Sequence, residues 1–178
     1  MSLDCQAHIR VGRDRDAALM RIEGRATFAC GQAVKTFGLQ AITTGARTIA
    51  VDCATCESMD STMMGILVML AQNLPTGQIH LCDTNGKVRR AITGLGLAQF
   101  FTFSSCTNQD RFAWERLTDD DTSCTLEQTE PRQVMIDAHE ALVQVTPDNV
   151  ARFRDVLELL RASDTKDTHP GQGESERN

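Results

Sequence analysis

The chain has 178 residues with 18 basic and 24 acidic side chains, and 41% of its residues are hydrophobic. That length suits one domain of about 100–200 residues with an appendage, and the composition is ordinary for a soluble globular protein. No apolar run reaches the roughly 18–20 residues of a membrane span, and the start lacks the pattern of a signal peptide, so we expect a cytoplasmic protein with reduced thiols.

The first part of the chain predicts a β-hairpin followed by a helix. Apolar and polar residues alternate over residues 8–11 and 18–22, and the polar stretch 12–16 between them is typical of a turn. From about residue 29 apolar residues recur at helical spacing, and Gly45 supplies a stop signal for that helix.

The middle of the chain alternates between short strands and helices. The predicted elements are a strand at 48–51, a loop at 53–59, a helix at 60–73, a strand at 78–82, a helix at 85–92, a strand at 101–103 and a helix at 108–117. This alternation implies an α/β domain, with a mixed sheet of four to five strands and helices packed against it.

Charge divides the chain into a body and an extension. Residues 1–118 carry 12 basic and 10 acidic residues, whereas residues 119–178 carry 6 and 14. We therefore predict a domain at 1–117, an acidic linker at 118–130, a C-terminal helical hairpin at 131–162 and a disordered tail at 163–178.

The predicted hairpin has an apolar face on each helix. The two faces consist of Ile136, His139, Leu142 and Val143 in the first helix and of Val150, Phe153, Leu157 and Leu160 in the second. Thr146 and Pro147 suit the N-cap and the first position of the second helix. Because such a helix is marginal alone, we expect the hairpin to dock on its own domain or on a second copy, as in a homodimer. His139 is expected to be packed or to cap there, not to bind a ligand.

The turn at Asp60-Ser61 is the strongest candidate site. A hydroxyl at a helix N-terminus lies beside free backbone N–H groups at the positive end of the helix dipole, where a phosphate would be stabilised. Taken alone, the same pattern also fits a simple helix cap.

The residues around this turn resemble the STAS domain family of anti-sigma factor antagonists. Strand 49–52 ends in Asp52, and Asp60-Ser61-Thr62-Met63-Met64-Gly65 is similar to the family's Asp-Ser-Ser/Thr-Gly-x-Gly, with matching elements over about residues 5–117. The resemblance implies that Ser61 is the phosphoacceptor, with Thr62 as the fallback acceptor. The implied partner-binding residues are Asp60, Ser61, Thr62, Met63 and Met64. Met63 stands where the family has glycine, and it places bulk where glycine would admit a partner backbone.

The resemblance implies a regulator that is not an enzyme and needs no cofactor. It would bind an anti-sigma factor with a serine-kinase domain and be released when Ser61 is phosphorylated. A first alternative is a non-phosphorylated interaction module of the same fold in another assembly, such as a lipid-transport ATPase or a stress-sensing complex. No nucleic-acid partner is expected, because the basic cluster at residues 87–90 is small. No membrane insertion is expected, because the chain has no long apolar run.

A second alternative, from another class, is a thiol or zinc protein that uses Cys53-x-x-Cys56. A zinc site needs about four ligands, and His80 and Cys82 could complete one if the fold brings them close. A redox pair would lie at a helix N-terminus, whereas the predicted helix begins at Asp60, four residues after Cys56. Ordinary thiols without a metal are therefore the preferred interpretation.

Overall fold

A seven-stranded mixed sheet forms the centre of the structure, a computed structural model that describes residues 7–105, 113–117 and 130–162. The strands are β1 (Ala7–Asp14), β2 (Ala17–Ala26), β3 (Thr48–Asp52), β4 (Cys56–Met59), β5 (Ile79–Cys82), β6 (Phe101–Ser104) and β7 (Glu115–Arg116). The helices are α1 (Gly31–Thr43), α2 (Ser61–Gln72), α3 (Gly86–Gly94), α4 (Pro131–Val143) and α5 (Pro147–Ala162), with short 3-10 turns η1 (Phe28–Cys30) and η2 (Ala98–Phe100).

The sheet is antiparallel at one side and parallel at the other. Its order is β6-β5-β3-β2-β1-β7, and β4 pairs with β2 outside this path. β1 pairs antiparallel with β2 and β7, whereas β2–β3, β3–β5 and β5–β6 are parallel. Parallel neighbours require crossover helices, and α1, α2 and α3 supply them.

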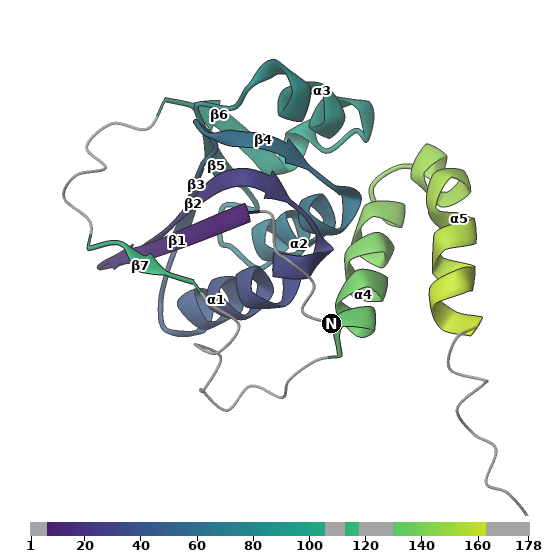
Figure 1. The fold of residues 1–178 in the computed structure, drawn as a ribbon, viewed down its shortest axis with the longest axis horizontal. Coiled ribbons are helices and arrows are strands. Elements are labelled where there is room, and N and C mark those ends of the chain that lie inside the picture. Colours follow the sequence, from purple (N-terminus) through teal and green to yellow (C-terminus); the bar gives the residue numbers. More distant parts are fainter. Residues whose placement is uncertain (1–6, 106–112, 118–129, 163–178) are drawn as a thin grey trace, which may run out of the picture.

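One face of the sheet and the helix α2 form the core. Alternate strand residues such as Met20, Ile49 and Leu81 are fully buried, and so are Leu67 and Leu70 of α2. The intervening strand residues point to the other face, as the pleat of a strand requires. Figure 1 shows α1 and α2 together on one side of the sheet.

The predicted α/β fold with a C-terminal helical extension is confirmed, but the sheet has more strands than the predicted four to five. β4 lies inside the expected loop 53–59, because β2 continues past Gly24 and offers it a pairing edge. β7 lies where the end of the helix 108–117 was predicted, and that prediction is wrong at its C-terminal end, because Glu115 and Arg116 pair with β1. Residues 108–112 of that stretch lie outside the described residues.

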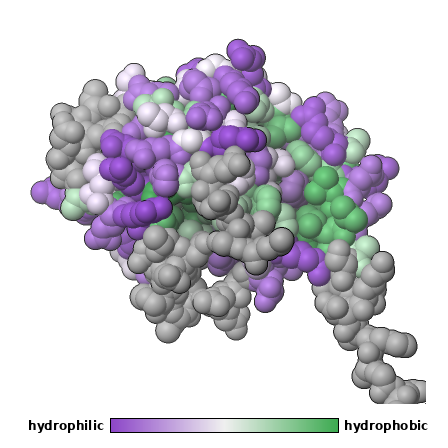
Figure 2. Space-filling view, viewed as in Figure 1, coloured by the Kyte–Doolittle hydropathy of each residue, from purple (hydrophilic) through white to green (hydrophobic). Residues whose placement is uncertain are grey.

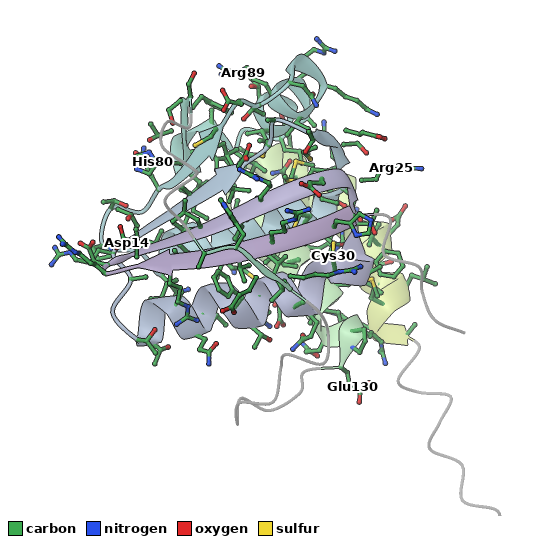
Figure 3. All side chains as sticks on the ribbon, turned by 60° about the vertical axis from the view of Figure 1, so that its left-hand side comes forward. Asp14, Arg25, Cys30, His80, Arg89 and Glu130 are labelled. Atoms are coloured by element: carbon green, nitrogen blue, oxygen red, sulfur yellow. The ribbon has the colours of Figure 1, made fainter. Side chains whose placement is uncertain are left out.

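The parallel strands and the second strand of the hairpin run toward the end of the sheet where α2 begins. Figure 3 places Arg25 and Cys30 at this end, opposite the hairpin turn next to Asp14. The Asp60 N–H donates a hydrogen bond to the Ala26 carbonyl oxygen at 3.0 Å, which joins the start of α2 to the end of β2. The Asp60-Ser61 turn therefore lies at the carboxyl end of the sheet.

The C-terminal helices form a hairpin in which α4 packs against α2 and α5 packs against α4 (Figure 1). Phe153 and Leu157 of the predicted α5 stripe are buried, whereas Val150 is 43% exposed. Figure 2 shows apolar surface over this hairpin, on the right of the view. The predicted linker 118–130 and tail 163–178 lie outside the described residues, except for residue 130.

Among the helices of the described ranges, none combines the length and the apolar character needed to cross a membrane.

Candidate functional site

Asp60 holds the start of α2 with both of its carboxylate oxygens. Oδ1 accepts a hydrogen bond from the Met63 N–H at 2.8 Å, which makes Asp60 the N-cap of the helix. Oδ2 accepts from the Phe28 N–H at 2.8 Å, in the turn that leads from β2 to α1. The carboxylate thus ties two segments together.

Ser61 is the first residue of α2, and its hydroxyl contacts the C-terminal hairpin. Its Oγ lies 3.0 Å from Nε2 of His139 in α4. Nδ1 of the same ring lies 2.7 Å from the Met135 carbonyl oxygen, which can only accept, so Nδ1 carries a proton. In the neutral ring Nε2 is then an acceptor, and the Ser61 hydroxyl donates to it.

The His139 ring is held in place from two sides. It is 4% exposed and lies edge-on against the Phe153 ring, with the centroids 5.2 Å apart. The sequence predicted a packed or capping histidine here, and the structure adds the bond to Ser61. The spacing along the chain gives no sign of this bond, because the two residues are 78 positions apart.

Of the residues implied to bind a partner, only Asp60 and Ser61 retain intermediate exposure. Thr62 is 4% exposed, Met63 is fully buried and Met64 is 4% exposed. Met63 therefore fills the core and does not project from the surface at the position where the family has glycine.

Gly65, one turn along α2, is where α4 comes closest. A Cβ atom built on Gly65 would lie 2.2 Å from the Ala138 carbonyl oxygen, far inside van der Waals contact. The absence of a side chain at Gly65 thus lets the backbone of α4 lie directly on α2.

The two cysteines of Cys53-x-x-Cys56 are free, buried thiols next to each other. Their mutual hydrogen bond, followed by burial, raises the pKa of Cys53, and the same bond lowers the pKa of Cys56. Cys82 is disulfide-bonded, so the prediction of reduced thiols is wrong for this residue, because pairing depends on spatial proximity that spacing does not reveal. Within the ranges that the structure describes, no three His, Cys, Asp or Glu side chains gather as metal ligands, and His80 and Cys82 do not complete a site with the two thiols.

The hairpin, the parallel half of the sheet and the capped serine turn define an α/β domain of the STAS type. The family model of the STAS domain matches residues 8–109, more than half of the chain. The chain belongs to the STAS domain family, and the resemblance seen in the sequence is confirmed.

A solved structure of an anti-sigma factor antagonist shares this fold. SpoIIAA in its unphosphorylated form is similar at a TM-score of 0.50 and 20% identity, over 57% of this chain and 90% of that one. An anti-sigma factor antagonist from Mycobacterium paratuberculosis gives a TM-score of 0.49 at 16% identity, over 62% of this chain and 94% of that one. No curated protein matches this chain in sequence.

Proposed function

We propose that this protein is an anti-sigma factor antagonist-like regulator in the cytoplasm. It binds a serine-kinase anti-sigma factor, and phosphorylation of Ser61 releases it. The observation that carries the proposal is the place of Ser61, a partly exposed residue that carries a hydroxyl at the first position of α2 in a STAS domain.

Electrostatics at the start of α2 favours this role. The N-terminus of a helix carries partial positive charge, so a phosphate on Ser61 would be stabilised by the helix while it repels an acidic partner. A phosphoserine adds about −1.5 to −2 charges at neutral pH, which is enough to reverse the balance of a docking surface. Binding and release need no chemistry by this chain, so the proposed regulator is not an enzyme.

Phosphate mapping tests the proposal directly. The full chain is incubated with ATP and a kinase-type anti-sigma factor, and we expect one phosphate on Ser61 that is lost in Ser61→Ala. Thr62→Val is the matched control, because it removes the neighbouring hydroxyl and keeps the volume of a buried side chain. Ser61→Asp should weaken capture of the anti-sigma factor on the order of tenfold. Phosphate only on Thr62, or none with an active kinase even after α4 has been displaced from α2, contradicts the proposal.

One observation favours the alternative of a STAS interaction module that is not phosphorylated. The Ser61 hydroxyl forms a hydrogen bond with His139, as expected of a serine with a structural role. In that case partner binding should be the same for the wild type, Ser61→Ala and Ser61→Asp, which the capture experiment measures.

A further inference from the structure

α4 lies on a surface of the body that we call the Ser61 face, made of Gly31, Lys35, Ser61, Thr62 and Gly65 of α1 and α2. Any kinase or partner that acts on Ser61 must approach this face. The function proposed for Ser61 therefore raises the question of what the helix on top of it does, and the inference below rests on that function.

The contact at Ser61 itself excludes a phosphoryl donor. In the bonded arrangement the hydroxyl hydrogen points to His139 Nε2, 3.0 Å from Oγ. That imidazole is almost fully buried between α4, α5 and the body. A phosphoryl group transferred to Oγ needs this space, and the proton must leave toward a base of the kinase. Both require His139 to move away.

The backbone contact at Gly65 shows that the Ser61 face is shaped for a helix. α4 crosses α2 so closely that a single methyl group at Gly65 would overlap the carbonyl of Ala138. Beside it, Val134 of α4 lies over Gly31, because a Cβ built on that glycine would be 3.6 Å from Val134 Cγ1. Small residues at such a crossing let two helix backbones approach each other.

Charge adds a third point of attachment. Lys35 Nζ of α1 lies 2.7 Å from Asp137 Oδ2 of α4, and the two side chains are 11% and 27% exposed. This ion pair links α1 to α4 beside the glycine crossing. The Ser61 face thus meets α4 at three points. The Ser61 hydroxyl donates to His139, Gly65 admits the backbone at Ala138, and the Lys35 ammonium group pairs with the Asp137 carboxylate.

The hairpin can leave without breaking the sheet. The STAS family model ends at residue 109, and no strand of the seven-stranded sheet comes from the hairpin. Its departure removes packing from α2 and leaves the strand pairing of the body complete.

We infer that the α4–α5 hairpin is an intramolecular occupant of the partner-docking surface. In the closed state α4 fills the Ser61 face and keeps the hydroxyl from a kinase. In the open state the hairpin is displaced, and the Ser61 face receives a helix of the anti-sigma factor that has a small residue opposite Gly65 and a carboxylate opposite Lys35.

The variant Gly65→Ala in the full chain tests this occupancy. Alanine is the better helix former, so α2 itself is not weakened, but its Cβ must push α4 away. Gly94→Ala in α3 is the matched control, since a Cβ there meets no heavy atom within 4 Å. Asp137→Lys, which places two cations together, opens the hairpin by a second route without touching the body, and Glu158→Lys makes the same charge change at an exposed position of α5.

Two readouts that need no kinase follow the opening. Hydrogen exchange measured by mass spectrometry should become about tenfold faster or more in α4, while β3 and β5 keep their protection. In a Ser61→Cys background, alkylation of that position by N-ethylmaleimide, mapped by peptide mass, should accelerate by a similar factor. Both controls should behave like the parent chain.

Equal alkylation of Cys at position 61 with and without Gly65→Ala overturns the inference, because the face would already be open. Loss of protection in β3 and β5 together with α4 also overturns it, since the hairpin would then be an inseparable part of the core. An opened variant that is alkylated rapidly, yet gains no phosphate from an active kinase, supports the occupancy and contradicts the proposed function alone.

Discussion

At the scale of single residues, Asp60 explains why the serine turn could be recognised in the sequence. Capping is local chemistry: an Asp before an apolar run accepts from an N–H three residues later, as Asp60 does from Met63. The second bond of Asp60, to the Phe28 N–H, joins residues 32 positions apart and leaves no local pattern. The helix start was therefore predictable, whereas its link to the turn before α1 was not.

Replacing Asp60 should weaken the fold through both of these bonds. We expect Asp60→Ala to lower the free energy of unfolding by about 1–3 kcal/mol, the range for losing a helix cap and leaving a backbone N–H without its acceptor. Asp60→Asn keeps a side-chain oxygen for one of the two bonds and should lose less. Denaturant titration measures both, and Asp155→Ala at an exposed position of α5 is the control. An unchanged midpoint in Asp60→Ala would show that the carboxylate is not needed for stability.

His139 marks the limit of prediction at this scale. A histidine on the apolar face of a helix looks the same in sequence whether it packs on neighbours or bonds a serine of another helix. Only the docking of α4 on α2 decides between these, and that depends on Gly65, which was not among the residues implied to bind a partner. The motif and the C-terminal helix were thus both predicted, but the place where that helix docks on the body was not.

At the scale of elements, a helix with a long apolar run was predicted well, whereas short strands at the edges of the sheet were not. α2 was predictable because twelve helical residues with almost uniform burial produce a run too long for a strand. β4 and β7 have four and two residues and exist because an edge of the sheet is available to pair with. The apolar stripe predicted for α5 is correct at its centre, where Phe153 and Leu157 are buried. It is wrong at Val150, because Asn149 is the residue that is buried there.

The buried middle of α2 should contribute strongly to stability. Leu67 and Leu70 have no exposed surface, and Leu70 fits against Gly38 of α1 so tightly that a Cβ there would lie 2.4 Å from its Cδ1. We expect truncation of either leucine to alanine to cost about 2–5 kcal/mol, measured by denaturant unfolding. Leu159→Ala, at a side chain that is 71% exposed, is the control and should cost far less. A loss below about 1 kcal/mol at both core positions would mean that α2 is peripheral.

At the scale of the whole molecule, polar side chains join the two helices of the hairpin at both of its ends and tie one of these ends to the body. The buried Asn149 donates to the carbonyl oxygens of Leu142 at 2.9 Å and Leu95 at 3.0 Å, which ties α5 to α4 and to the end of α3. At the other end Arg132 of α4 donates to the carbonyl oxygen of Leu160 in α5. The hairpin is therefore a unit of its own that is also docked, a property that a sequence with two amphipathic helices suggests but cannot place.

Deleting residues 131–178 tests what this unit contributes. The remaining chain keeps all seven strands and the whole region matched by the STAS family, so we expect it to fold. Its free energy of unfolding should fall on the order of 2–5 kcal/mol, because the surface of α1 and α2 that Val134 and Ala138 cover becomes exposed. The exposed surface should also promote self-association or tighter partner binding, seen by light scattering and affinity capture. Deleting residues 163–178 alone keeps the hairpin and is the control. If residues 1–130 stay folded, monomeric and equally stable with unchanged partner binding, the hairpin is neither part of the core nor an occupant of the Ser61 face.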